Sequence, residues 1–372
     1  MTEADDLQSR RAKAREAATR LLSGTPYRST AELLGDLARH APDLPTDRYG
    51  QGELIAGLEE RASGLLGKEA AVFLPSGIMG QQAALRSWAE RSGNRSVALH
   101  PAAHLQEHER QAMTVLHGLR PLWLTSERRQ PTAADVTKLA EPFGTLHVEL
   151  PLRSAGFLLP SWDELTASVQ AARSRGAYVH FDGARLWEST EHFGRPLAQI
   201  AALADSVYVS FYKGLGGPAG AAVAGPRDFI GQVRAWQHRH GGQLFTLAPY
   251  VVGALLGLDR ELPRLPERVR QAKAIAAALA EIEGVAVRPD PPHTQEFQIH
   301  AAAPAAMLNE AVLELAERTG TLLFGAFEDG TVPGWSMTEV NVGEPAMGWS
   351  AEEVRHAVSG LLADARRTME PS

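Results

Sequence analysis

The sequence predicts an α/β protein, with a large three-layer α/β/α domain around a mostly parallel sheet and a smaller C-terminal α+β domain. Strand-like and helix-like segments alternate over about 200 residues, which is typical of a sheet covered by helices on both faces. After Gly242, longer helical stretches replace this alternation. The length of 372 residues is also too great for one ordinary core. We therefore expect an N-terminal helical segment over 1–46, a large domain over 47–250 and a small domain over 251–372.

The individual elements follow from apolar spacing and from the turn residues between apolar runs. Ser29 and Thr30 are typical cap residues for the second helix. Helices are expected over 7–23, 30–40, 53–66, 78–88, 162–174, 247–282 (interrupted near Pro263 and Pro266), 304–319 and 350–368. Strands are expected over 70–74, 96–99, 145–150, 177–182, 206–211 and 220–224.

Composition and charge argue against several classes of protein. The formal net charge of -7 is spread along the chain, whereas a nucleic-acid partner would require a basic patch. The sequence has no Cys, which excludes disulfides, thiolate metal sites and a cysteine nucleophile. No apolar run reaches the roughly 18 residues of a membrane span, and residues 1–20 lack the apolar region of a signal peptide. We expect a cytoplasmic globular protein without nucleic-acid or membrane partners.

Two segments place an acid and a lysine at one edge of the predicted sheet. Asp182 ends one expected strand and precedes Gly183-Ala184-Arg185, while Lys213 follows another and precedes a glycine-rich stretch. The carboxyl ends of parallel strands line the ligand crevice of such sheets. A lysine amine forms a Schiff base with an aldehyde cofactor, and a carboxylate keeps the pyridine nitrogen of pyridoxal 5′-phosphate (PLP) protonated. Alone, each residue is more simply a turn or surface residue, but the pair favours a PLP site.

A dinucleotide site is a competing interpretation of the glycine-rich segment 214–220. That fingerprint requires a helix directly after it and an acid about 20 residues further on. Here Pro218 disturbs the turn, and 221–224 looks like another strand. The segment therefore favours close approach of the backbone to a cofactor over a dinucleotide loop.

Two further segments supply candidate cofactor ligands. Ser76, Gly77 and Ile78 precede a helix whose first N–H groups can hold a phosphate, although an ordinary helix cap is the simpler interpretation of this segment alone. His104 and His108 are four residues apart and would share a helix face. Without a third ligand we expect no metal, and an imidazole stacked over the cofactor or a pair of surface histidines remain the alternatives.

With these segments together, the chain resembles the L-threonine aldolase / β-eliminating lyase family of PLP enzymes. The resemblance covers about 47–258, and its most specific parts are Asp182-Gly183-Ala184-Arg185-Leu186 and Lys213-Gly214-Leu215-Gly216 in this order. Weaker support comes from Tyr49-Gly50, Leu58-Glu59-Glu60, Leu66-Gly67-Lys68-Glu69-Ala70-Ala71, Phe73-Leu74-Pro75-Ser76-Gly77, the His104/Glu109 pair and Gly241-Gly242. The resemblance implies the PLP-dependent transferase-like fold type I.

The resemblance also implies a role for each candidate residue. Lys213 would be the Schiff-base lysine, Asp182 the partner of the pyridine nitrogen and His104 the residue stacked on the ring. The phosphate would be held by Ser76, Gly77 and Ile78, and Arg185 would reach the substrate carboxylate. Family members are dimers of dimers with sites at subunit interfaces, so a homodimer or homotetramer is expected.

Several positions depart from the family pattern. The family's N-terminal Ser-Asp-Thr-type segment is replaced by a helical extension, the usual threonine after the phosphate-loop glycine is Ile78, and a second histidine expected within 125–146 is missing. An arginine expected shortly before the last helix is absent from 337–343, where Glu339 stands. A glutamate would repel the carboxylate that an arginine binds. Glu339 is thus a candidate substrate-contact residue in an altered pocket, or a solvated residue at its rim.

Three hypotheses about function follow. The first is a PLP-dependent lyase that cleaves the Cα–Cβ bond of a β-hydroxy-α-amino acid into glycine and an aldehyde, with Lys213, Asp182 and His104 as catalytic residues. The second keeps PLP but changes the reaction to β-elimination, transamination or racemisation of an unusual amino acid. The third is a non-catalytic protein with the PLP fold, against which Lys213 and Asp182 argue.

Overall fold

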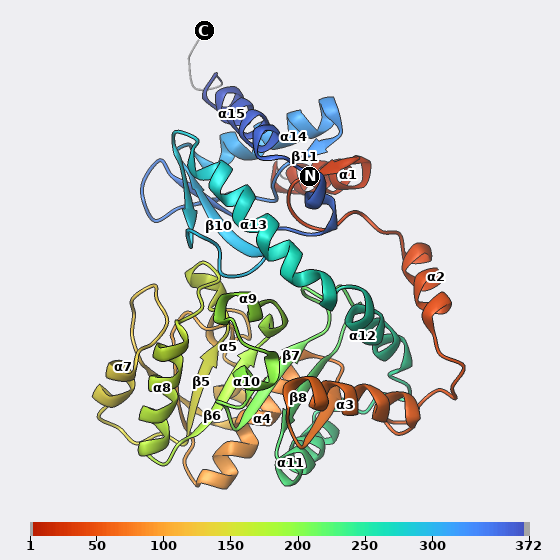
Figure 1. The fold of residues 1–372 in the computed structure, drawn as a ribbon, viewed down its shortest axis with the longest axis vertical. Helices are drawn as coiled ribbons and strands as arrows, with labels where there is room; N and C mark the ends of the chain where they lie inside the picture. The colour runs from red at the N-terminus through yellow and green to blue at the C-terminus, as the bar shows by residue number, and fades with distance from the viewer. Residues whose placement is uncertain (1–2, 368–372) are drawn as a thin grey trace. The chain divides into compact units, whose positions relative to one another are not determined.

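The computed structural model describes residues 3–367, which form two compact units (Figure 1). The large unit is residues 36–265, and the small unit is residues 3–35 together with 266–367. The large unit is therefore contiguous in sequence and extends at both ends beyond the expected range 47–250. Within the described residues, no helix combines the length and apolarity required to cross a membrane.

A seven-stranded sheet forms the centre of the large unit. Its order is β2-β8-β7-β6-β5-β3-β4, and only β8 runs against its neighbours, so the sheet is mostly parallel. Apolar runs of four to six residues build these strands, and most are buried along their whole length, as expected for a sheet covered on both faces. The strands are β2 (Ala70–Leu74), β3 (Ser96–Leu99), β4 (Arg120–Trp123), β5 (Thr145–Glu149), β6 (Tyr178–Gly183), β7 (Ser206–Ser210) and β8 (Ala221–Gly225).

Helices cover both faces of this sheet. One face carries α4 (Gly77–Ser92) and α11 (Arg227–Arg239), and the other carries α3 (Glu53–Leu66), α8 (Trp162–Ser174) and α10 (Leu197–Ala201) (Figure 1). Under α4, the Trp88 ring stacks between Tyr178 and Phe229, at 4.2 and 4.1 Å between ring centroids. The remaining helices are α5 (His104–Glu107), α6 (Ala112–His117), α7 (Ala133–Lys138), α9 (Thr190–Phe193) and α12 (Ala248–Arg260). The predicted three-layer fold is confirmed.

The small unit is an α+β structure with its own apolar core. Its antiparallel sheet has the order β12-β13-β10-β9, and a separate parallel pair joins β1 to β11. Phe297, Phe324 and Val340 belong to a buried cluster that the helices cover. The strands are β1 (Arg20–Leu21), β9 (Val285–Arg288), β10 (Glu296–Ala301), β11 (Thr321–Leu322), β12 (Glu328–Asp329) and β13 (Ser336–Asn341). The helices are α1 (Glu3–Ala17), α13 (Leu265–Ala280), α14 (Ala305–Thr319) and α15 (Ala351–Arg367), with α2 (Thr30–His40) crossing the boundary at residue 36.

One expected helix is wrong at its end. The helix expected over 7–23 ends at Ala17, and residues 20–21 form β1, paired with Thr321 and Leu322 of β11. A partner 301 residues away leaves no periodic signal in the local sequence. The cap expected for α2 is confirmed, because the Ser29 hydroxyl accepts the Glu32 N–H and the Glu32 carboxylate accepts the Ser29 N–H.

Asp47 ties the loop before α3 to the start of α12. Its carboxylate is buried and accepts the N–H groups of Gly50, Leu247 and Ala248 and the hydroxyl of Thr246. We expect Asp47→Ala to lower the free energy of unfolding by about 2–4 kcal/mol, since it leaves several buried donors without an acceptor. Urea denaturation of the full chain measures the effect. The exposed Asp43 gives a control, because Asp43→Ala should change stability by less than about 0.5 kcal/mol.

Candidate active site

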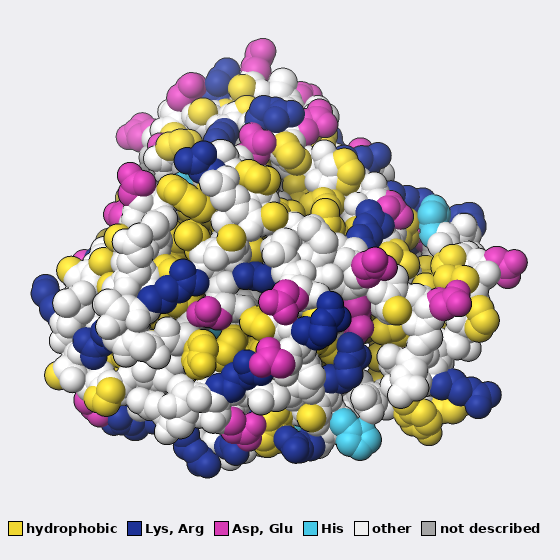
Figure 2. All heavy atoms as spheres, turned by 60° about the horizontal axis from the view of Figure 1, so that its bottom comes forward, with side chains coloured by type: hydrophobic (Ala, Val, Ile, Leu, Met, Phe, Trp, Pro, Cys, Tyr) yellow, Lys and Arg dark blue, Asp and Glu magenta, His cyan; other side chains and the backbone are white. Residues whose placement is uncertain are grey.

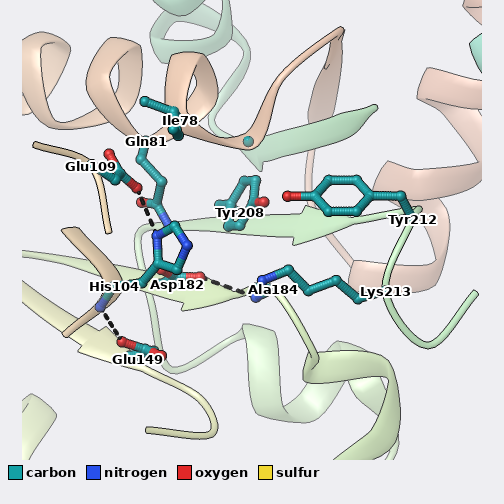
Figure 3. Close-up of a pocket in the computed structure, with 11 residues that line it drawn as sticks. Ile78, Gln81, His104, Glu109, Glu149, Asp182, Ala184, Tyr208, Tyr212 and Lys213 are labelled. Carbon is teal, nitrogen blue, oxygen red and sulfur yellow. Dashed lines mark hydrogen bonds and ion pairs between the residues drawn. The ribbon is translucent and has the colours of Figure 1, made fainter. Parts of the chain in front are cut away.

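A pocket opens at the carboxyl ends of the parallel strands of the large unit (Figure 3). Strands β5 and β6 end there with Glu149 and Asp182, which are register partners. Lys213, from the turn after β7, lines the same pocket. The structure therefore brings together the acid and the lysine that the sequence placed at this edge.

Asp182 is a buried carboxylate with few partners. Its Oδ1 accepts the Ala184 N–H at 3.1 Å, and its Oδ2 lies 3.9 Å from Nε2 of His147. Burial raises the pKa of Asp182 to about 7, and the nearby Glu149 carboxylate is the second cause of this increase. A bound cationic group would reverse this effect by favouring the ionised carboxylate.

Glu149 is a second buried carboxylate, which the sequence did not single out. It accepts the His104 N–H at 2.7 Å and the Arg153 N–H at 3.2 Å, and burial raises its pKa. It thus joins two loops that border the pocket. An acid at the end of a fully buried strand, in register with Asp182 on the neighbouring strand, is the signal that could have identified it.

His104 is held by Glu109. The imidazole Nδ1 lies 3.1 Å from Oε1 of Glu109, whose other oxygen accepts the Gln82 amide at 2.8 Å. Because the Glu109 carboxylate can only accept here, it favours the His104 tautomer with the proton on Nδ1. His108 belongs to the same short turn, at 5.1 Å between ring centroids, but no cluster of three metal-ligating side chains occurs in residues 3–367.

The start of α4 forms one wall of the pocket. Ser76 is the N-cap residue, yet its side chain makes no capping hydrogen bond, and the first N–H groups of a helix have no acceptor within it. A Cβ atom at Gly77 would lie 2.1 Å from the Tyr208 hydroxyl, so only glycine allows this close approach. Ile78 lines the pocket and is 41% exposed. The helix end thus offers N–H groups to an anion.

The segment after Lys213 contains the expected glycine turn. Gly216 has a φ of +67°, and a Cβ at Gly217 would lie 2.7 Å from the Phe211 carbonyl oxygen. The Lys213 Nζ lies 5.9 Å from the centre of the Tyr212 ring. The chain continues directly into β8 rather than into a helix, which agrees with rejecting a dinucleotide loop.

The two predicted substrate contacts are not among the residues that line this pocket. Arg185 follows β6, and its Cζ lies 5.2 Å over the Phe157 ring, outside the lining drawn in Figure 3. Glu339 lies on β13 of the small unit, paired with Gln298 of β10. Their contacts with a substrate stay predictions.

His147 is a further buried residue beside the site, one position beyond the range in which a second histidine was expected. Neither of its ring nitrogens has a hydrogen-bond partner in the part of the chain that the structure describes. Burial lowers the pKa of His147 well below its usual value, so the ring is neutral. Its Nε2 lies 3.9 Å from Oδ2 of Asp182, so this neutral ring forms part of the buried environment of the Asp182 carboxylate.

Comparisons with known proteins agree with this geometry. The family model of the beta-eliminating lyases matches residues 21–303. The low specificity L-threonine aldolase of Escherichia coli (strain K12) is 28% identical over 276 residues, which cover 73% of this chain and 81% of that protein. A candidate aromatic amino acid beta-eliminating lyase/threonine aldolase from Exiguobacterium sp. 255-15 is 34% identical, with a TM-score of 0.89 over 96% of this chain and 99% of that one. A candidate L-allo-threonine aldolase from Listeria monocytogenes EGD-E is 33% identical, with a TM-score of 0.90 over 95% and 99% of the two chains.

Fold and site together define a PLP-dependent lyase of fold type I. The catalytic chemistry is of the aldolase type, a carbon–carbon cleavage. The chain belongs to the beta-eliminating lyase family.

The residues of the pocket fit PLP. The N–H groups at the start of α4, near Gly77, can donate hydrogen bonds to a phosphate. Lys213 can bind an aldehyde, and the buried Asp182 can pair with a protonated ring nitrogen. The absence of a side chain at Gly77 supports this fit, because a Cβ atom there would fill the space beside the Tyr208 hydroxyl at the start of α4. The buried carboxyl of Asp182, with its raised pKa, likewise requires a cationic partner to ionise readily.

Proposed function

We propose that this enzyme cleaves β-hydroxy-α-amino acids such as L-threonine or L-allo-threonine into glycine and an aldehyde. The observation that carries the proposal is the meeting of Lys213, Asp182 and His104 around one pocket. Threonine aldolases among the relatives support the substrate class. When bound, PLP supplies an electron sink for the pair of electrons released at Cα.

Each residue has a proposed task in holding the cofactor. Lys213 would hold the aldehyde carbon of PLP. Asp182 would keep the ring nitrogen protonated, and the N–H groups at Ser76, Gly77 and Ile78 would hold the phosphate. His104 would cover the ring. These tasks are the ones that the family resemblance implies, and they are supported by the pocket, which all of these residues line except Ser76, the N-cap residue of α4.

His104 is also the proposed base for the β-hydroxyl proton. With Nδ1 held by Glu109, Nε2 is the nitrogen that can take up this proton as the Cα–Cβ bond breaks and the aldehyde forms. Glu109 then stabilises the imidazolium. Arg185 is proposed to bind the substrate carboxylate, and Glu339 is proposed as a contact at the substrate rim.

A substrate panel tests the reaction. The PLP-loaded enzyme is incubated with L-threonine, L-allo-threonine and L-phenylserine, and the aldehyde and glycine are both quantified. Equal amounts of the two products are expected. Release of a keto acid without aldehyde would instead indicate elimination or transamination, and no product from any member of the panel would reject the aldolase assignment.

We further propose a cytoplasmic homodimer or homotetramer with no nucleic-acid partner. Tyr49 and Phe245, in edge-to-face contact at 5.5 Å, are 55% and 61% exposed and form an apolar surface suited to another subunit. On the face drawn in Figure 2, basic and acidic side chains are interspersed rather than gathered by sign, unlike a nucleic-acid surface. Sedimentation of the full chain tests the proposed assembly, and a monomer at micromolar concentration would contradict it.

A further inference from the structure

A chain of four buried side chains runs from the core of the large unit to the pocket. The Trp88 Nε1 lies 2.7 Å from the Ser206 hydroxyl, which lies 2.7 Å from Nδ1 of His180. The His180 Nε2 lies 2.9 Å from Oε1 of Gln81. All four residues are at most 1% exposed. Trp88 and Gln81 are on α4, while Ser206 and His180 are on β7 and β6.

The first hydrogen bond favours one direction for the rest of the chain. An indole can only donate, so the Ser206 oxygen accepts from Trp88 and its own proton is available for Nδ1 of His180. His180 is neutral, because burial lowers its pKa to about 3. Its proton is then on Nε2, which donates to Oε1 of Gln81. The amide nitrogen of Gln81 is thereby left facing away from His180.

The reverse orientation of the amide is less favourable. It would place the Gln81 oxygen toward a pocket lined by the carboxylates of Glu109, Glu149 and Asp182. It would also require the Ser206 hydroxyl proton to find another acceptor. The orientation with the NH₂ group toward the pocket satisfies the Trp88, Ser206 and His180 donors and faces the negative charge of the pocket with a donor.

Gln81 therefore presents an unused donor to the pocket. Its Nε2 is buried and has no hydrogen-bond partner among residues 3–367. The side chain descends from α4 into the pocket, toward His104 and Asp182 (Figure 3). A buried amide without an acceptor is unfavourable, and a ligand acceptor would remove that cost.

The geometry points to Gln81 as a further cofactor-binding residue, whose amide nitrogen donates a hydrogen bond to an oxygen of bound PLP. The inference rests on the proposed function in one respect, namely that PLP occupies this pocket. The Trp88–Ser206–His180 chain then has the task of fixing the amide so that its donor, and not its acceptor, meets the cofactor. Nothing in the sequence singled out Gln81, because its three partners in the chain are distributed over 88–206.

Titration of the cofactor-free full chain with PLP tests the inference through visible absorption. Gln81→Met, which keeps the side-chain shape but removes the donor, should weaken binding about ten- to a hundredfold, as for loss of a hydrogen bond to a charged acceptor. Gln81→Leu is a second replacement of similar volume should the first fold poorly. Gln237→Met is the matched control, because Gln237 is also buried but donates its amide hydrogen bond to the Phe73 carbonyl, outside the pocket lining. The PLP affinity of this control variant should equal that of the wild type.

Ser206→Ala tests the supporting role of the chain separately from the donor itself. It breaks the chain two hydrogen bonds before the amide, so it should reduce stability and weaken PLP binding by less than the Gln81 variants do, because the Gln81 donor is still present. Wild-type affinity in the Gln81 variants, or equal weakening by Ser206→Ala, would overturn the inference while leaving the proposed function intact. A wild-type protein that binds no PLP would refute the proposed function itself, and the inference with it.

Discussion

We expect Lys213→Ala to abolish the lysine-dependent visible absorption of the PLP-loaded enzyme and to lower kcat by at least about a thousandfold. Lys213 lines the pocket beside Asp182, and no second lysine is among the residues that line it. The methyl group of alanine has no amine that would hold the cofactor aldehyde. Absorption spectra with added PLP, and aldehyde release from L-threonine, measure the two effects.

A surface lysine provides the control for this substitution. Lys138 lies exposed on α7, and Lys138→Ala should leave both the spectrum and kcat unchanged. If Lys213→Ala retained a wild-type spectrum, the assignment of Lys213 would be wrong, even with the fold correct. Partial activity restored by added methylamine would support the assignment, because the free amine would replace the missing one.

Asp182→Asn should lower kcat by about 100- to 1000-fold, as for loss of a preorganised charge at a developing charge in the transition state. The asparagine has the same shape but cannot hold a protonated ring nitrogen as an ion pair. The variant should still bind PLP through Lys213 and show its absorption band. Aldehyde release at saturating substrate measures kcat, and a rate within threefold of wild type would contradict the role.

The same residue should make the cofactor-free protein sensitive to pH. Burial and the neighbouring Glu149 raise the pKa of Asp182 to about 7, whereas an unfolded aspartate has a pKa of about 3.9. Between about pH 4 and 7 the folded chain therefore holds a proton that the unfolded chain has released. Stability contributed by this group is full below about pH 4 and is lost as pH rises to 7.

Two measurements check this dependence. The free energy of unfolding of the cofactor-free protein, followed in urea from pH 4.5 to 8, should fall less steeply in Asp182→Asn than in the wild type. PLP affinity should show the opposite trend, because the bound ring favours ionised Asp182, and should gain strength up to about pH 7. Identical pH profiles for wild type and variant would contradict the raised pKa.

Much of the large unit could be predicted from short-range sequence patterns. The buried runs of β2 and β3 and the helix α8 were expected at their observed bounds, because their apolar residues and flanking turn residues are local. The pairing of Asp182 with Lys213 was also accessible, since both follow strands that end at the same edge of a parallel sheet.

The parts that the sequence did not reveal depend on contacts between distant residues. The local sequence predicts helix at β1 because the partner strand β11 lies 301 residues further along the chain. Glu149, His147 and Gln81 are ordinary residues within their own elements, and only burial against residues from other strands gives them a role at the site. Such roles arise from the packed sheet and have no local pattern.

The pairing of β1 with β11 has a consequence for synthesis on the ribosome. The large unit is one continuous stretch, so its core can form while translation continues. Residues 20–21 cannot form their strand pairing until residues 321–322 have been synthesised, about 15–60 s later at ordinary elongation rates. Strand β1 thus reaches its final place only after β11 has been made, and a nascent chain stalled before residue 321 has no partner for this strand.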